Sequence, residues 1–374
     1  MRQNTPESQQ HTRTLSAALQ LRCGTNPIDP NASEAIRRQQ AESCERADAY
    51  VGEPLFELAR QCLRIEQMPE PRNRRDMVRS AFNTAALASV LTDSVTATVA
   101  EGFDATPDST AGWTSEVDRN SFKTAPAVVL GSADKLDPLP SGGQADSARV
   151  GGDAEQYAVG RFAKRFAIDD QDFVSDNLGA LIGVPKAMGL AAAELRPDLI
   201  YTILLGNETL DADSVALFDA AAHVNLDSTV LSADAIESGI ARIAKQKEKD
   251  RDLNLRVTHL IVPSALKITA ANILHNAQLD EAENIVLRTD ARLDNGVTDP
   301  RDGTEHSANG AQWFLSAGSH RTIEVGFLSG TNRRPVVVDW MRTGGKWGIG
   351  FGITYDIGAK ALDYRALYKS TGAA

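Results

Sequence analysis

The sequence of 374 residues predicts an α+β protein, and three observations lead to this fold class. Apolar residues recur at helical spacing in the N-terminal part and again over residues 169–207, which form the longest helical region. The middle of the chain alternates helical patterns with short strand patterns. The C-terminal part consists mainly of short runs of β-branched and aromatic residues, which are typical of strands.

The N-terminal part is expected to be an extended arm followed by helices. Residues 1–31 are polar apart from a short apolar patch at residues 15–21, and this predicts the arm. Helices are expected over residues 33–49 and 54–66, with a further short helix over residues 75–89. The second of these helices carries one apolar stripe, formed by Leu55, Leu58, Ala59, Cys62 and Leu63.

Two strand-like runs, at residues 122–130 and 156–168, enclose a long polar stretch rich in Gly, Pro, Ser and Asp. That stretch is too long for an ordinary hairpin turn inside a compact domain. We therefore expect a long two-stranded arm over residues 125–166 that leaves its own domain. An isolated hairpin of this kind is marginally stable unless it lies on something else.

The long helical region begins with Asp169, Asp170 and Asp172, which favour a helix N-terminus. Pro185 is expected to begin a second helix, and Pro197 is expected to bend it. Further along, Ser232 is placed to cap a helix that carries Ile236, Ile240 and Ile243.

The remaining elements complete a mixed α/β unit and a β-rich end. A strand is expected over residues 255–262, a helix over 263–277 and a strand over 284–287, with later strands over 312–316, 322–327, 335–340 and 347–355. The last of these lies in "RTGGKWGIGFGITYDIG", whose glycines invite a nucleotide-binding interpretation. Small and apolar residues alternate there with period two and no helix follows, so we predict closely packed strands instead of a phosphate loop.

Composition restricts the function. A formal net charge of -11 argues against a general nucleic-acid binder, which needs a basic surface. The three cysteines show no C-x-x-C spacing, which suits a reducing compartment without a disulfide framework. The N-terminus lacks the apolar region of a secretory signal, and no apolar run reaches the about 18 residues of a membrane span.

No catalytic, cofactor or metal site is predicted. The six histidines are scattered without H-E-x-x-H spacing, and Ser329 lacks the G-x-S-x-G context of a hydrolase. His223 lies near Asp219 and Asn225, where a loop role is expected because Asp and Asn bond readily to local backbone. The aspartates at the start of the long helical region are expected to cap it and not to bind calcium.

Five segments carry a resemblance to a known family. They are "AIDDQDFVSDNLGALIGVPKAMGLAAAELRPDLIYTILLGN", "ALFDAAAHVNL", "THLIVPSAL", "WFLSAGSHRTIEVGFLSGTNRRPVVV" and "DIGAKALDYRALYKSTG". In this order they resemble the tailed-bacteriophage major capsid proteins of the Hong Kong 97 fold, and locally the branch of the Mu-like major head subunit.

This resemblance implies a domain organisation with a peripheral (P) domain and an axial (A) domain. It places an N-terminal arm and helices at residues 1–95, an E-loop region at 96–168, the spine helix of the P domain at 169–208, mainly the A domain at 209–320, P-domain strands at 321–358 and a C-terminal segment at 359–374. The candidates for E-loop contacts between subunits are Phe122, Lys135, Pro138, Pro140 and Phe162.

The resemblance also implies a function without a cofactor, metal or membrane. The chain is expected to assemble with itself into hexamers and pentamers of an icosahedral head that encloses double-stranded DNA, in the bacterial host cytoplasm. Further partners would be portal, scaffold, prohead protease and decoration proteins. DNA contact is expected to be weak and to come from Arg72, Arg74 and Arg75, unless these pair with Glu66, Glu70 and Asp76.

Two alternative functions stay open. One is an encapsulin-like compartment, which the long N-terminal extension disfavours, and the other is an α/β enzyme with an unrecognised site. Some relatives cross-link neighbouring subunits through Lys and Asn. Lys123, Lys135 and Lys164 lie in the E-loop region, but no acceptor is identifiable, so non-covalent packing is expected.

Overall fold

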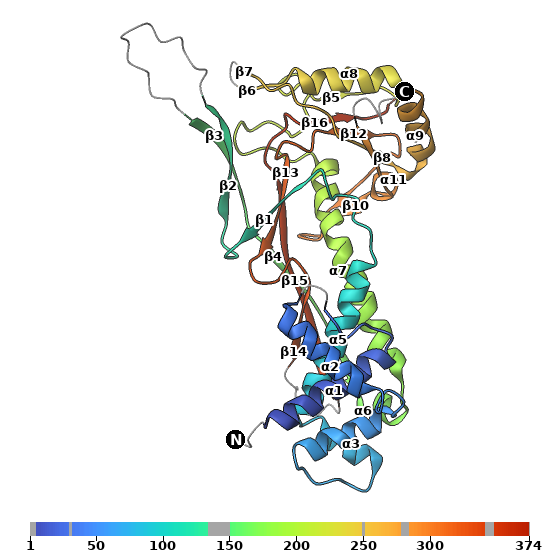
Figure 1. Ribbon diagram of the computed structural model, residues 1–374. Helices are drawn as coiled ribbons and strands as arrows, with labels where there is room; N and C mark the ends of the chain where they lie inside the picture. The colour runs from blue at the N-terminus through green and yellow to red at the C-terminus, as the bar shows by residue number, and fades with distance from the viewer. Residues whose placement is uncertain are drawn as a thin grey trace, which may run out of the picture. The chain divides into compact units, whose positions relative to one another are not determined.

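The computed structural model describes residues 5–29, 32–133, 150–248, 251–277, 284–340 and 348–373 (Figure 1). The chain forms two compact units, each built from three separate stretches. Unit 1 contains Met1–Pro107, Arg161–Ala193 and Thr331–Tyr355, and unit 2 contains Asp108–Gly160, Glu194–Gly330 and Asp356–Ala374. Helices and strands are mixed in both, as the α+β prediction requires.

The expected extended arm is wrong over residues 6–22, which form helix α1 (Pro6–Arg22). The Thr5 hydroxyl accepts a hydrogen bond from the backbone N–H of Ser8, and Pro6 supplies a φ angle suited to the first helical turn. Seven consecutive residues, 14–20, are buried. This second half of the helix is buried all round, as in an internal element. The sequence did not indicate a buried helix here, because Thr14, Ser16 and Gln20 are polar.

The other N-terminal helices are α2 (Glu34–Ala47), α3 (Leu55–Ile65), α4 (Arg74–Ala81) and α5 (Ala85–Asp104). The predicted helices α2 and α3 are confirmed, and every residue of the α3 stripe is buried. The helix expected over residues 75–89 is instead divided between α4 and α5. The division occurs at Thr84, whose hydroxyl accepts the N–H of Leu87 and caps α5.

The long helical region contains a short helix, α6 (Asp170–Val174), and one continuous helix, α7 (Leu178–Gly206). Asp169 and Asp172 form a capping box at the start of α6, which confirms the predicted capping role. The expectation that Pro185 begins a separate helix is wrong, because α7 runs through it and through Pro197. Alanine and leucine, which are strong helix formers, are frequent around both prolines.

Helices α5 and α7 approach each other through glycines in unit 1. A Cβ atom at Gly189 would lie 2.2 Å from the carbonyl oxygen of Val99, and one at Gly102 would lie 2.3 Å from that of Lys186. Both contacts are with backbone, which cannot rotate away. The two helices can therefore cross at this distance only with glycine at these positions.

The core of unit 1 combines the N-terminal helices with later parts of the chain. Its buried residues include Leu15, Leu19, Leu63, Leu87, Val90, Phe173, Leu181, Ile349, Phe351 and Ile353. The last three come from strand β15 (Gly348–Ala361), whose first half pairs with β14 (Val336–Trp340). Strand β4 (Gly160–Asp169) also pairs with β15.

The glycines of the C-terminal motif lie in strand β15, as predicted, at positions 348, 350 and 352. A Cβ atom at Gly348 would lie 2.3 Å from the carbonyl oxygen of Ile168 in β4. Glycine here allows two backbones to come close, and no helix N-terminus follows for a phosphate. Residues 341–347 lie outside the described residues.

Asp170 is a fully buried carboxylate that joins α6 to α4. Its Oδ2 atom accepts hydrogen bonds from Nε of Arg79 at 2.7 Å and Nε of Arg75 at 2.9 Å. Burial alone would raise the pKa of Asp170, but the two guanidinium groups outweigh burial and lower it to about 2. The carboxylate therefore stays charged and paired at neutral pH.

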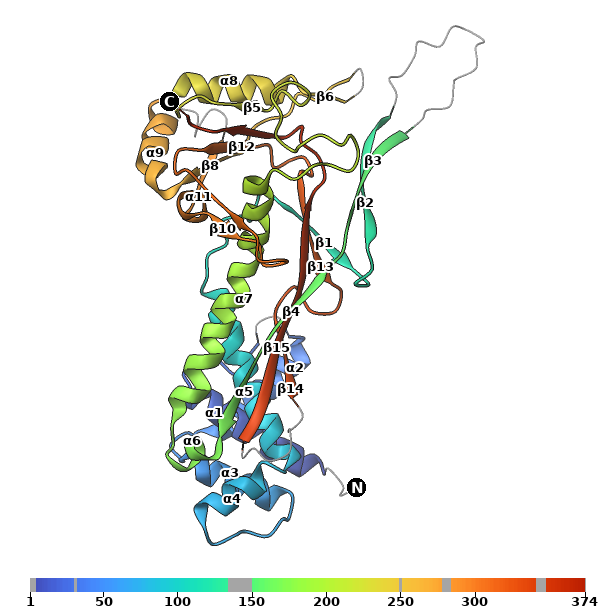
Figure 2. The same cartoon turned by 180° about the vertical axis from the view of Figure 1, so that it is seen from behind.

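Unit 2 contains a five-stranded sheet in the order β5-β16-β12-β8-β9. Its strands are β5 (Leu226–Asp227), β8 (His259–Pro263), β9 (Val286–Asp290), β12 (Trp313–Ser316) and β16 (Leu367–Ser370). Helix α8 (Ala233–Ala244) contacts β16, and α9 (Lys267–Asn276) contacts β8 and β9 (Figure 2). Ser232 caps α8, as predicted. The core between them includes Ile236, Ile243, Leu260, Val262, Leu274, Trp313, Leu315 and Tyr368.

Unit 2 also contains β1 (Ser115–Arg119), which pairs in parallel with β13 (Ile323–Leu328), while β13 pairs antiparallel with the second half of β15. Smaller elements are the 3-10 turn η1 (Ser264–Leu266), α11 (Arg292–Asn295), the pair β6 (Lys247–Glu248) and β7 (Arg251–Asp252), and the pair β10 (Val297–Thr298) and β11 (Glu305–His306). The predicted strands of the C-terminal part are thus confirmed.

Replacing Gly189 by alanine is expected to destabilise unit 1 by about 1–3 kcal/mol, because the added methyl group forces α5 and α7 apart. Gly183→Ala on the same helix is the matched control, since a Cβ atom there meets nothing within 4 Å. The control should stabilise by about 0.5–1 kcal/mol through helix propensity. Denaturant unfolding of both variants measures the difference, and equal effects would contradict the close crossing.

Asp170→Asn is expected to destabilise unit 1 by about 2–4 kcal/mol at pH 7, because two arginines lose their buried partner. The folded pKa lies below the unfolded one, so the stabilisation is complete above about pH 4 and is lost as pH falls toward 2. Denaturant unfolding across this pH range should show the two proteins converging at low pH. Glu45→Gln, on the exposed side of α2, should change little at any pH.

Candidate functional site

The hairpin of unit 2 is formed by strands β2 (Ala125–Ala133) and β3 (Val150–Tyr157). They pair antiparallel from Ala125 opposite Tyr157 to Leu130 opposite Gly152, with a shift of register before Ala133. No further strand joins this sheet within the described ranges. Figures 1 and 2 show both strands rising from beside β1 and running to one side of the five-stranded sheet of unit 2.

The hairpin is shorter than the arm expected over residues 125–166, because β3 ends at Tyr157 and the chain then enters β4. Strand β4 belongs to unit 1, where Phe166 stacks on Phe351 with ring centroids 5.5 Å apart. The sequence concealed this division because its alternating pattern continues across Ala158 and Gly160.

The candidate contact residues therefore lie in different places. Phe122 precedes β2 and is 43% exposed. Phe162 lies on β4 in unit 1 and is half-buried, so its expected place in the hairpin is wrong. Lys135, Pro138 and Pro140 lie outside the described residues.

Tyr157 anchors the base of the hairpin to a buried carboxylate. Its hydroxyl donates to Oε1 of Glu324 at 2.7 Å, and Glu324 is only 1% exposed. Burial raises the pKa of Tyr157 above its ordinary value, and the neighbouring carboxylate raises it further, so the hydroxyl remains a donor. Gly326 makes room for the ring, because a Cβ atom there would lie 2.6 Å from the tyrosine oxygen.

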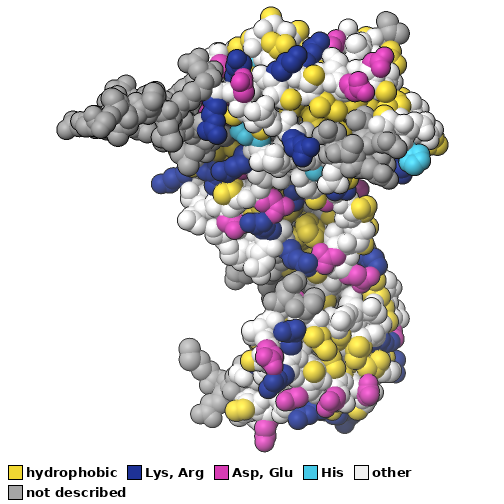
Figure 3. Space-filling model, turned by 45° about the horizontal axis from the view of Figure 1, so that its top comes forward, with side chains coloured by type: hydrophobic (Ala, Val, Ile, Leu, Met, Phe, Trp, Pro, Cys, Tyr) yellow, Lys and Arg dark blue, Asp and Glu magenta, His cyan; other side chains and the backbone are white. Residues whose placement is uncertain are grey.

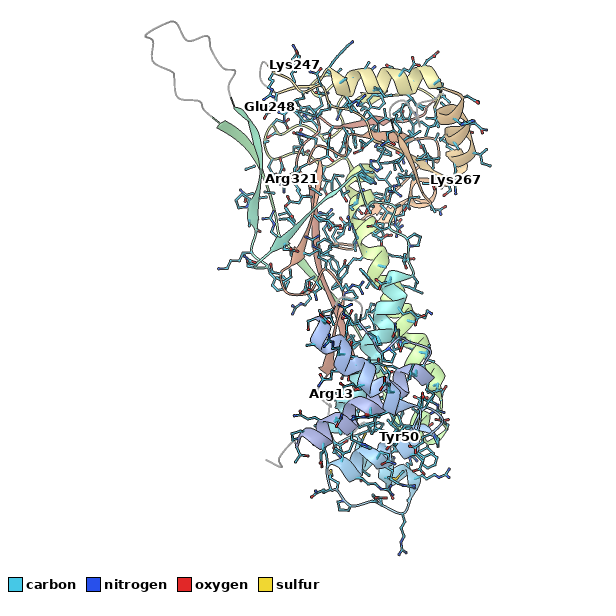
Figure 4. The ribbon with its side chains drawn as sticks, in the orientation of Figure 1. Arg13, Tyr50, Lys247, Glu248, Lys267 and Arg321 are labelled. Atoms are coloured by element: carbon cyan, nitrogen blue, oxygen red, sulfur yellow. The ribbon has the colours of Figure 1, made fainter. Side chains whose placement is uncertain are left out.

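Two arginines complete this cluster. Nη2 of Arg119 donates to the same Glu324 oxygen at 2.8 Å, and its guanidinium lies over the Tyr157 ring, 4.5 Å from the centroid. Arg321, labelled in Figure 4, pairs with the other carboxylate oxygen. The carboxylate is thus paired with cations as well as hydrogen-bonded, which a buried charge requires.

Glu155 provides a second anchor on the same face of β3. Its carboxylate accepts the backbone N–H groups of Asp211 and Ala212, each at 3.0 Å, and lies 3.7 Å from Nζ of Lys360. Burial raises the pKa of Glu155, while the two N–H donors act in the opposite direction. Ala154, Gln156 and Ala158 alternate with these anchors and are exposed. One face of β3 is therefore fixed to unit 2, and the other is open.

The residues considered for catalysis have structural roles. His223 is buried, with its Nε2 atom 2.8 Å from Asp213 and its ring stacked 3.6 Å from that of Tyr364. The Asp219 carboxylate accepts N–H groups from its own turn, which confirms the predicted loop role. The Ser329 hydroxyl donates to Asn120. With these partners, His223, Asp219 and Ser329 do not combine into a catalytic pair of a nucleophile and a general base.

No metal site or disulfide is found in the part of the chain that the structure describes. No group of three or more His, Cys, Asp or Glu side chains there could hold a metal ion. All three cysteines are free, and Cys23 and Cys62 are buried. None of the described helices is both long and apolar enough to cross a membrane.

Two of the three arginines considered for DNA contact, Arg74 and Arg75, are engaged within unit 1. Arg75 bonds to Asp170, and the guanidinium of Arg74 lies 4.2 Å from the ring centroid of Phe56. Glu70, expected as one of their partners, pairs instead with Arg64. On the face shown in Figure 3, acidic and basic side chains are interspersed. Basic side chains therefore do not form a continuous surface on this face.

Comparison with known proteins identifies the family. The model of a family described as "Phage capsid protein" matches residues 153–370. The chain is also similar to the capsid of cyanophage Pam1, with 13% identity and a TM-score of 0.48 over 70% of this chain and 91% of that one. It is similar as well to the virus-like particle of Pyrococcus furiosus, with 10% identity and a TM-score of 0.44 over 75% of this chain and 98% of that one.

No curated protein sequence matches the chain. The family match does not distinguish the Mu-like branch, which stays a prediction. It agrees with the capsid fold and the structural role that the sequence predicted. Because the match covers more than half of the residues, the chain belongs to the phage capsid protein family.

Proposed function

We propose that copies of this chain assemble into the hexamers and pentamers of an icosahedral head that encloses double-stranded DNA. The observation that carries the proposal is the β2–β3 hairpin, which is anchored at its base and is not extended by a third strand within the described residues. A two-stranded hairpin is marginally stable in water, and its edges present unpaired backbone groups. A neighbouring copy that covers it supplies the missing contacts.

The anchors at the base support this role. Tyr157 and Glu155 hold one face of β3 against unit 2, while the alternate residues stay exposed. Such a base fixes the direction of the hairpin before assembly, so less conformational entropy is lost when a neighbour binds it. A hairpin without these contacts would have to be ordered entirely by the partner.

We further propose that the predicted domains correspond in part to the two units. The core of unit 1 unites the start of the spine helix with the P-domain strands, and the five-stranded sheet of unit 2 lies mainly within the predicted A domain. An extended N-terminal arm that reaches a neighbouring copy has no support over residues 6–22, which are helical and buried in unit 1 at residues 14–20.

Packaged DNA, portal, scaffold, prohead protease and decoration proteins remain the proposed partners, with assembly in the host cytoplasm. An encapsulin-like compartment would assemble in the same way but would enclose protein cargo. The nucleic-acid content of shells isolated from infected cells separates the two. The membership in a structural family opposes the enzyme alternative.

Deletion of residues 132–152 is expected to leave a folded protein that assembles poorly. It joins Gly131 to Asp153 and leaves a two-residue turn between the paired Val129 and Asp153, with both base anchors retained. Electron microscopy and sedimentation should show shells or capsomers for the full chain and mainly unassembled subunits for the variant.

Circular dichroism of the deletion variant provides the control, because its melting should stay close to that of the full chain. Loss of folding would mean that the hairpin tip packs within its own subunit. A full chain that stays monomeric over a wide concentration range would contradict the assembly itself.

Binding of the unassembled protein to free duplex DNA is expected to be weak and to fall steeply between about 50 and about 200 mM salt, because only phosphate contacts would contribute. The net charge of -11 opposes any stronger attraction. Fluorescence anisotropy with labelled duplexes of different sequence measures the affinity at each salt concentration. Tight, sequence-dependent binding at physiological salt would indicate a regulatory protein instead of a capsid protein.

A further inference from the structure

The loop at residues 208–217 of unit 2 holds the base of the β2–β3 hairpin. The backbone N–H groups of Asp211 and Ala212 in this loop donate to the carboxylate of Glu155, each at 3.0 Å. The carboxylate of Asp211 in turn accepts the backbone N–H of Gln156 at 3.2 Å. Strand β3 is therefore held at two consecutive residues by this one loop.

The residue after these donors, Asp213, joins the loop to a histidine. Its Oδ1 atom accepts the backbone N–H of Val215 at 2.9 Å, and its Oδ2 atom lies 2.8 Å from Nε2 of His223. His223 is buried, so its ring has a fixed place in unit 2, whereas the Asp213 side chain lies at the surface. The histidine thus fixes the same loop that anchors β3.

Both ring nitrogens of His223 face oxygen acceptors. Nε2 faces the carboxylate of Asp213, and Nδ1 lies 3.3 Å from the carbonyl oxygen of Leu217. A neutral imidazole has one N–H group and satisfies one of these acceptors, while an imidazolium has two and satisfies both. The geometry around this buried ring therefore fits the protonated form. Loss of the proton leaves one ring nitrogen and one oxygen facing each other with lone pairs alone.

The C-terminal segment places further charged groups beside the ring. The His223 ring stacks on that of Tyr364, and the guanidinium of Arg365 lies 5.2 Å from the Tyr364 centroid. Arg365 is paired with the carboxylate of Asp363 at 2.8 Å, and His320 pairs with the same carboxylate. The positive charge of Arg365 is therefore balanced by its own partner.

Asp219 is the second carboxylate near His223. It accepts two N–H groups of its own turn, which lower its pKa, and His223 lowers this pKa further. Lys360, a cation beside the 208–217 loop, is engaged with Glu155 at 3.7 Å. The two carboxylates close to the ring thus favour a positive charge on it, while the neighbouring cations have carboxylate partners of their own.

We propose that protonated His223 holds the 208–217 loop against the hairpin base, and that loss of its proton loosens the anchor of β3. The inference rests on the proposed function, because the hairpin is the element that a neighbouring copy covers. Histidine changes its charge between about pH 5 and about pH 8, where most carboxylates stay ionised. The direction of the hairpin is thus better fixed in the lower part of this range, and assembly is favoured there.

Hydrogen exchange of the unassembled natural chain tests the proposal. The protection factors of the Asp211 and Ala212 amides, corrected for the intrinsic effect of pH, should fall about tenfold from about pH 6 to about pH 8. In Asp213→Asn, which keeps the side-chain shape without the charge, they should change by less than about twofold. His223→Gln should behave in the same way. His275→Gln, on the exposed side of α9, should keep the pH dependence of the natural chain.

Glu155 also titrates, because burial raises its pKa, but both loop variants retain it. The difference between the natural chain and these variants therefore reports the His223 contact. If His223→Gln fails to fold, Asp213→Asn still decides the result, because this side chain lies at the surface. Protection that follows the same pH profile in the natural chain and in Asp213→Asn would overturn the proposal.

Sedimentation velocity over a concentration series gives a second measurement. From about pH 6 to about pH 8, the protein concentration needed for half-maximal assembly should rise about fivefold more for the natural chain than for Asp213→Asn. An equal rise would overturn the effect on assembly while leaving the proposed function intact. Failure of the natural chain to assemble at any pH would overturn the proposed function, and hydrogen exchange would still decide the His223 contact by itself.

Discussion

The buried carboxylate of Glu324 holds the hairpin of unit 2 in place. It lies on β13 and receives the hydroxyl of Tyr157 from β3 and the guanidinium of Arg119 from β1. An unpaired charge at this depth would be strongly unfavourable, so each partner is needed for the others to remain buried. The direction of the hairpin, and any contact it makes with another copy, therefore depends on this carboxylate.

Local signals in the sequence allowed part of the fold to be predicted. The apolar stripe of α3 and the serine cap of α8 involve residues no more than four positions apart, where spacing alone is informative. Helix α1 was missed because its burial involves polar residues: Ser16 donates to Asp93, which lies 77 positions away. The end of β3 was missed because alternation continues into β4, although the two strands pair with different partners.

The candidate site was less predictable than the helices. A long hairpin was expected from two strand-like runs around a polar stretch, and this expectation is confirmed over β2 and β3. Its anchors could not be identified, because Tyr157 and Glu324 are 167 positions apart and neither belongs to a motif. The aromatic side chain of Tyr157 gave the right strand pattern, but nothing in the sequence indicated that a buried glutamate would receive its hydroxyl.

The interleaving of the two units has a consequence for synthesis of the chain. Unit 1 needs the stretch Thr331–Tyr355 and unit 2 needs Asp356–Ala374, so the early stretches of both units are synthesised long before their late ones. Residues 14–20 of the early helix α1 are buried, and Arg22 at its end pairs with the later Asp176. Early segments must therefore wait, partly folded, for late ones.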